Sequence, residues 1–115
     1  MIIISDTSAL ANLALVDQIW ILKSLYKTII IPDVVAQELG KANNPKIQDI
    51  PSLPWIDVRS VSDLMMAETL QQEHNLDPGE SYAIALAVEQ KGDELLMDER
   101  RGRQVATQLG LSIIE

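Results

Sequence analysis

The chain has 115 residues, 47% of them hydrophobic and 23% charged, which is the composition of one ordinary globular domain rather than of a disordered chain. It has no cysteine, which excludes disulfides and thiolate zinc sites. Together with a start that lacks the basic region of a signal peptide, this leads us to expect a cytoplasmic protein. The net charge of −8 counts against a broadly basic surface that coats nucleic acid, and no apolar run approaches the roughly 20 residues of a membrane span.

Strand-like and helix-like segments alternate along the first half of the chain. Runs of β-branched residues predict strands, and apolar residues at helical spacing predict helices. Pro32 suits the first turn of one helix, and Gly40 suits its end. The expected elements are a strand over 2–5, a helix over 8–26 with a break or new start at Asp17, a strand over 28–31, a helix over 32–39 and a proline-rich loop over 41–54.

The second half continues this alternation. The expected elements are a strand over 55–61, a helix over 62–74 that starts at Ser62 or Asp63, a turn over 75–79, a helix over 80–90 ended by Gly92, a strand over 95–97, a helix over 99–109 ended by Gly110, and a strand over 111–114. This order predicts an α/β fold, with a parallel sheet covered by helices, in a single domain over 1–115. Right-handed crossovers then place the carboxyl ends of the strands at one edge.

Two of the predicted strands are each followed by an aspartate. Asp6 comes directly after the strand over 2–5, and Asp98 directly after the strand over 95–97. Both side chains should therefore emerge at the edge where open α/β sheets bind their ligands. Each aspartate also precedes a predicted helix, so the alternative is that each one simply caps that helix. Neither residue alone decides between the two interpretations.

Glu80 begins the alanine-rich helix and has two interpretations of its own. Asp77 stands three residues before it, with proline between them, and this spacing predicts a capping box. Yet Glu80 also shares the apolar stripe of its helix with Ile84 and Ala87. A carboxylate on an inward stripe is unfavourable unless something binds it, which makes Glu80 a candidate ligand.

Glu38 lies on the same side of its predicted helix as Val34, Val35 and Leu39. A carboxylate on this apolar face is expected to point into a cleft. Together with Asp6, Glu80 and Asp98 it gives four acids that repel one another unless a cation or protons intervene.

Oxygen ligands of this kind favour Mg²⁺ or Mn²⁺ over zinc, and such ions catalyse the hydrolysis of phosphodiesters. The single histidine, His74, falls on a predicted helix surface, so acid–base chemistry by histidine is not supported.

Four segments, in this order, carry a resemblance to a known family. They are ISDTSAL over 4–10, IPDVVAQEL over 31–39, LDPGESYAIALA over 76–87 and LLMDER over 95–100. With them the chain resembles a PIN domain, the metal-dependent ribonuclease fold of many prokaryotic toxin–antitoxin systems. The match in order and spacing extends over nearly the whole chain.

The resemblance implies a three-layer fold with a five-stranded parallel sheet in the order 3-2-1-4-5. It also implies a Mg²⁺ or Mn²⁺ site, an RNA substrate, an antitoxin partner and a homodimer. The four acids of that site would be Asp6, Glu38, Glu80 and Asp98, supported by the hydroxyl of Ser8 and by Glu99 as an auxiliary acid.

The arginines that follow Asp98 have two interpretations. Arg100, Arg101 and Arg103 can form a solvated helix face, or they can contact the phosphates of RNA beside the metal.

Two competing functions remain open. Family members commonly continue past the fifth strand with helical sequence, so the chain is expected to lack the usual C-terminal extension. It would then be a truncated or degenerate PIN-like binding protein that assembles without cutting. A receiver-like signalling domain is the other alternative, but it needs an aspartate at the end of the third strand. Asp57 is followed by Val58 and so falls inside that strand.

Several large apolar residues are expected to pack rather than to form a special site. Trp20 and Trp55 are expected in the core, with a dimer or antitoxin surface as the alternative. Core or interface packing is also expected for Leu64, Met65, Met66 and Leu70.

Overall fold

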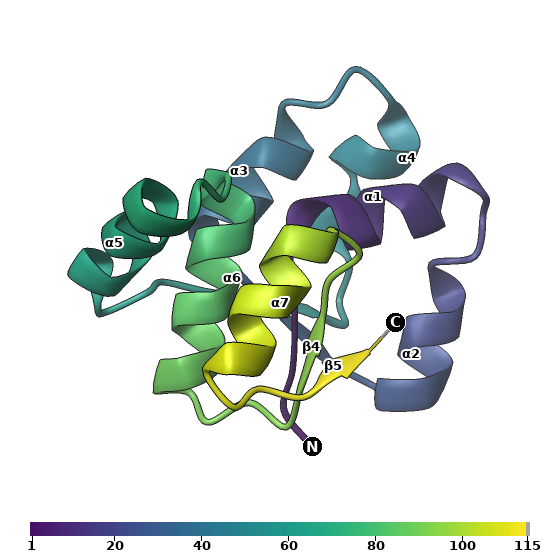
Figure 1. Ribbon diagram of the computed structural model, residues 1–115. Coiled ribbons are helices and arrows are strands. Elements are labelled where there is room, and N and C mark those ends of the chain that lie inside the picture. The colour runs from purple at the N-terminus through teal and green to yellow at the C-terminus, as the bar shows by residue number, and fades with distance from the viewer. Residues whose placement is uncertain (115) are drawn as a thin grey trace.

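A computed structural model of the chain describes residues 1–114, and its centre is one parallel five-stranded sheet (Figure 1). The strand order is β3-β2-β1-β4-β5, and each neighbouring pair is parallel. The strands are β1 (Ile3–Ser5), β2 (Ile29–Pro32), β3 (Ile56–Arg59), β4 (Glu94–Leu96) and β5 (Ile113–Ile114). The predicted α/β fold and the strand order implied by the resemblance are both confirmed.

Helices connect the strands and cover the sheet. In Figure 1, α6 and α7 lie in front of the strands, with α5 beside α6. None of the helices described is long and apolar enough to cross a lipid bilayer. The helices are α1 (Thr7–Leu15), α2 (Trp20–Tyr26), α3 (Asp33–Gly40), α4 (Pro45–Gln48), α5 (Leu64–His74), α6 (Pro78–Glu89) and α7 (Arg100–Gln108), with a 3₁₀ helix η1 at Ile50–Ser52.

Two hydrophobic cores lie on opposite faces of the sheet, because successive strand residues point in opposite directions. Ile4 and Leu95 face the core formed with α5, α6 and α7. Their neighbours Ile3 and Leu96 face the core formed with α1, α2 and α3. Both faces of each central strand are therefore buried, which explains why these strands read as continuous apolar runs.

The segment 8–26 forms two helices, so the break expected at Asp17 is confirmed. Asp17 has a φ of +57°, a left-handed conformation that aspartate tolerates better than most residues. The backbone N–H of Asp17 donates to the carbonyl of Ala14, and that of Gln18 donates to the carbonyl of Leu13. These two bonds close α1, and the chain then turns into α2.

Two expectations about local structure are wrong in part. The segment 41–54 is not a plain loop, because it contains α4 and η1. Asn44 caps α4 by accepting a hydrogen bond from the Lys46 N–H at 2.9 Å, and Ile50 of η1 is buried in the core. Pro32 lies at the end of β2, one residue before α3, rather than in the first turn of that helix.

Core packing, the first expectation for the large apolar residues, holds for some of them and is wrong for others, while their interface alternative stays a prediction. Trp55 packs partly buried against the core that includes α1 and α3, as expected, but 58% of Trp20 is exposed on α2. Met65, at the start of α5, is 77% exposed, and Leu64 beside it is also exposed. These three side chains therefore lie at the surface, because the helix positions that they occupy turn away from both cores.

The order of the strands places β1 and β4 side by side at the point where the chain reverses its direction across the sheet. Ser5 pairs with Leu96, and the N–H of Asp6 donates to the carbonyl of Leu96 at 3.3 Å. A crevice beyond the carboxyl ends of two such strands is where open α/β sheets bind ligands. Asp57 lies inside β3, as expected, and β3 therefore does not end on an aspartate at that edge.

Candidate functional site

Asp6 joins β1 to α1 and uses its two carboxylate oxygens differently. Its Oδ1 accepts the N–H of Ala9 at 3.0 Å and so caps α1. Its Oδ2 lies 3.4 Å from the hydroxyl of Ser8. The side chain is almost completely buried, with 1% of its surface exposed. The capping interpretation is therefore correct for one oxygen, and the other oxygen accepts only a long hydrogen bond from Ser8 among the residues described.

The burial of Asp6 makes its ionisation unfavourable. Loss of hydration raises the pKa of the Asp6 carboxyl from its ordinary value of 3.8 to about 7. The N–H of Ala9 opposes this shift, whereas the negative charges of Asp98, Glu80 and Asp77 add to it. Asp98, Glu80 and Asp77 thus lie within electrostatic reach of Asp6, whereas Glu38 does not contribute to the shift of its pKa.

Glu80 forms the predicted capping box at the start of α6. Its N–H donates to Asp77 Oδ1 at 2.8 Å, and its Oε1 accepts the N–H of Asp77 at 3.2 Å. The second oxygen, Oε2, is buried and has no hydrogen-bond partner among the residues described. Burial also raises the pKa of Glu80 to about 6, and the charges of Asp77 and Glu99 contribute to the rise.

Asp98 does not cap the helix that follows it, so that alternative is wrong. The residue before α7 is Glu99, whose side chain makes no capping hydrogen bond. The carboxylate of Asp98 instead reaches across to α1. It accepts hydrogen bonds from the Ser8 hydroxyl at 2.7 Å and from Asn12 Nδ2 at 2.5 Å. Asp98 is exposed, in contrast to Asp6.

Glu38 projects from α3 toward the start of α1, where its Oε1 accepts a short hydrogen bond from the hydroxyl of Thr7. Gly79, in the first turn of α6, packs closely against this pair. A methyl group at Gly79 would lie 2.5 Å from Glu38 Oε1 and 2.7 Å from Thr7 Oγ1. Glu38 is half-buried.

The sequence alone does not single out Thr7, Asn12 and Gly79, although each contacts a predicted site acid. Asn12 carries a usable signal, because it follows Ser8 by four residues on an otherwise apolar helix. Thr7 and Gly79 carry no such local signal, and their contacts with Glu38 appear only in the folded structure.

The donor set suits a hard divalent cation. The acids supply carboxylate oxygens only, and the unpartnered Oε2 of Glu80 is a buried oxygen that needs a proton or a cation. Within residues 1–114, however, no three side chains of histidine, cysteine, aspartate or glutamate lie close enough together to hold a metal ion. Asp98 instead bonds Ser8 and Asn12, and Glu38 bonds Thr7.

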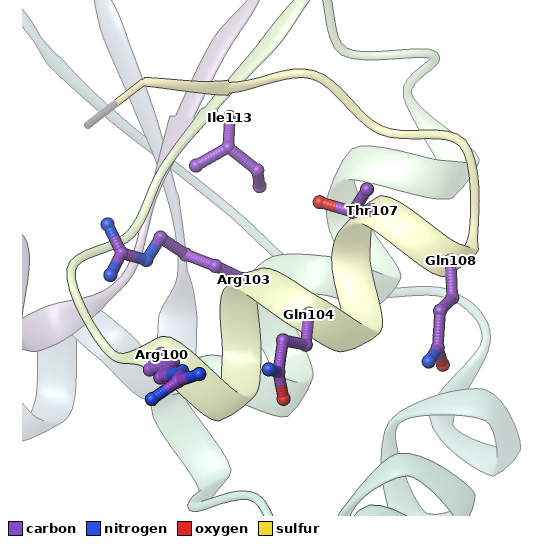
Figure 2. A pocket seen from close by; sticks show the side chains of 6 residues that line it. All are labelled: Arg100, Arg103, Gln104, Thr107, Gln108 and Ile113. Atoms are coloured by element: carbon purple, nitrogen blue, oxygen red, sulfur yellow. The ribbon is translucent and has the colours of Figure 1, made fainter.

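The arginines lie along α7, beside Glu80. One hollow on this helix is lined by Arg100, Arg103, Gln104, Thr107, Gln108 and Ile113 (Figure 2). A second hollow shares Arg100 and Gln104 with the first and extends to Glu80; its other walls are Asn75, Glu99 and Arg101. Arg100 and Arg101 are exposed. Cationic and amide side chains thus continue outward from the acids along one helix.

Replacing Asp6 by asparagine should remove a pH dependence of stability. The folded chain binds the proton of Asp6 more tightly than the unfolded chain, because its pKa is about 7 when folded and has the ordinary value of 3.8 when unfolded. The stability that this proton contributes is complete below the unfolded pKa and is lost as the pH rises through the folded pKa. We expect the free energy of unfolding without divalent cations to fall by up to about 4 kcal/mol over this range, and much less in Asp6→Asn.

Urea denaturation at a series of pH values measures this difference. Asparagine retains an oxygen that can cap α1, so the variant should fold. Asp63→Asn is the matched control, because Asp63 caps α5 through the N–H of Met66 but is exposed. The control should keep the wild-type slope of stability against pH. An equally steep slope in Asp6→Asn would contradict the account of a buried, protonated acid.

Comparison with known proteins agrees with the fold and with the resemblance. A family model described as a PIN domain matches residues 2–114, which is nearly the whole chain. A search of curated proteins found no significant match. The order of the strands and the extent of the family match support the same conclusion. The chain belongs to the PIN domain family, whose members are typically nucleases.

Proposed function

We propose that the chain is an endoribonuclease that uses Mg²⁺ or Mn²⁺ to hydrolyse phosphodiester bonds in RNA. The observation that carries this proposal is the buried, unpartnered Oε2 of Glu80, within electrostatic reach of Asp6. Asp6 and Glu80 both have raised pKa values at the carboxyl edge of β1 and β4. They form a candidate functional site, because acids with strongly shifted pKa values cluster at such sites and open α/β sheets bind ligands at this edge.

The cation would be held first by Asp6 Oδ2 and Glu80 Oε2. Asp98 and Glu38 are not grouped with them within residues 1–114 and would have to move toward the cation to become further ligands. A bound divalent cation lowers the pKa of water and neutralises the negative charge that develops at the phosphate. The protein would orient the acids around it. Ser8 and Asn12 fix Asp98, Thr7 fixes Glu38, and the capping box fixes one side of Glu80. Partners of this kind orient ligands and strengthen binding in metal sites generally.

RNA would approach along α7, where Arg100, Arg101 and Arg103 offer positive charge beside the acids. The rest of the molecule is unfavourable for a polyanion, because the net charge is −8. Arginine suits this role, since its guanidinium group binds phosphate with paired hydrogen bonds. Glu99, exposed at the start of α7 and close enough to Glu80 to raise its pKa, would serve as the auxiliary acid.

Removal of one site acid should abolish most of the cleavage activity. We expect Glu80→Gln and Asp6→Asn each to lower the rate of cleavage of a single-stranded RNA by at least ~100-fold in Mn²⁺ or Mg²⁺, because each loses a charged ligand. EDTA should stop the wild-type reaction. Glu68→Gln, an exposed acid on α5, is the matched control and should cleave at the wild-type rate. The proposal would be overturned if the wild type still cleaved RNA in EDTA and Asp6→Asn cleaved it as well.

Loss of two arginines should weaken RNA binding without altering the acids. In an Asp6→Asn background that leaves RNA intact, Arg100→Ala with Arg101→Ala should lower RNA affinity. The dependence of log K on log salt should also flatten by about 0.7 for each phosphate that the variant no longer neutralises. Arg59→Ala is the control, because Arg59 lies on β3 in an ion pair with Asp57. Fluorescence anisotropy at several salt concentrations gives both values. An unchanged slope would leave α7 as a solvated face only.

We further propose that the chain acts as the toxin of a toxin–antitoxin pair and forms a homodimer. Apolar side chains at the end of α1 and on α2 support a partner surface, since Val16, Trp20 and Leu25 are each more than half exposed. Light scattering should give the mass of a dimer, and Trp20→Ala should shift it toward the monomer. A wild-type monomer that still cleaves RNA would contradict the dimer alone. A chain that neither cleaves RNA nor binds Mn²⁺ would favour the non-catalytic assembly protein.

A further inference from the structure

Gly102 occupies a position where glycine is unfavourable for the helix itself. It is the third residue of α7 and is buried. In a helix interior, glycine costs about 1 kcal/mol relative to alanine, because it has more conformational freedom to lose. A buried glycine in the first turn therefore requires an explanation from packing rather than from the helix.

The contacts of Gly102 provide that explanation. A methyl group added there would lie 2.5 Å from Met97 Sδ and 2.8 Å from Glu80 Oε2. By contrast, a methyl group at Gly40, at the end of α3, would meet nothing within 4 Å. Helix α7 thus approaches the carboxylate of Glu80 more closely than any residue with a side chain would allow.

Gly102 packs against the carboxylate oxygen of Glu80 that the capping box leaves unpaired. Oε1 of Glu80 is held by the N–H of Asp77, whereas Oε2 is buried without a partner among residues 1–114. The two atoms that a methyl group would displace, Met97 Sδ and Glu80 Oε2, both belong to flexible side chains. An alanine at position 102 would therefore move Oε2 and leave the backbone of α7 in place.

We propose that Gly102 is a positioning residue that lets α7 close against Glu80 and sets the place of its unpaired oxygen for a divalent cation. This inference rests on the proposed function, because it assigns Glu80 as a cation ligand. Gly102 itself contacts neither the cation nor RNA in this proposal.

The test compares Gly102→Ala with Gly40→Ala, which introduces the same methyl group in open space. Mn²⁺ binding to each purified chain is measured by isothermal titration calorimetry, and folding is checked by circular dichroism. We expect Gly102→Ala to bind Mn²⁺ about 10- to 100-fold more weakly than the wild type, the usual effect of disturbing the support of a metal ligand. Gly40→Ala should bind Mn²⁺ as the wild type does.

A double-mutant cycle separates an effect through Glu80 from a general loosening of α7. In a Glu80→Gln background, Gly102→Ala should weaken Mn²⁺ binding by a much smaller factor than in the wild type, because the charge that it displaces is already gone. An equal factor in both backgrounds would overturn the role assigned to Gly102. Mn²⁺ binding by Gly102→Ala at wild-type strength would overturn it too.

Failure of the proposed function gives a different result. A wild-type chain that binds no Mn²⁺ overturns the cation site and this inference with it, whereas unaltered binding in Gly102→Ala overturns the inference alone. If Gly102→Ala does not fold, Gly102→Ala with Glu80→Ala should regain the fold, because the truncated acid removes one of the two clashes and leaves space into which the Met97 thioether can shift from the other. A double variant that stays unfolded would show that Glu80 is not what the methyl group displaces.

Discussion

The reciprocal hydrogen bonds between Asp77 and Glu80 are the interaction on which the site depends. They start α6, the helix that packs against the centre of the sheet, and they do so with a carboxylate that is buried in the process. A capping box at a helix end exposed to solvent would leave its acid hydrated. Here the acid lies under α7, so only one of its oxygens is satisfied and the other is left for a proton or a cation.

Much of the fold could be predicted from the sequence, because local signals and tertiary packing agree in it. Strands β1 and β2 are buried on both faces, which is the pattern of a parallel sheet, and Asp63 and Asp77 mark their helix starts as the structure has them. The exceptions are places where local signals conflict. The prolines of 41–54 suggested a loop, but one of them begins a short helix, and Trp20 is exposed although its residue type favours burial.

The sequence singles out the candidate acids of the proposed site but not the residues that contact them. Asp6 and Glu80 carry local signals: a position after an apolar strand and a position in a capping motif. What holds the acids comes from elsewhere in the chain, as with Thr7 on Glu38 and Asn12 on Asp98, and only the folded structure brings such segments together. Gly102 shows the limit most clearly. Glycine in a helix is unfavourable by its residue type, and the close packing against a carboxylate on another helix that accounts for it is visible only in the folded structure.

The two uses of Asp6 have an evolutionary consequence. One oxygen caps α1 and the other would serve the proposed site, so under that proposal selection for folding and selection for chemistry act on the same side chain. A descendant that lost its activity would still need a helix cap at this position. It could replace Asp6 by asparagine, serine or threonine far more readily than by alanine or a large apolar residue. Replacement of Asp6 by another capping residue would therefore indicate a descendant that keeps the fold but no longer cleaves RNA.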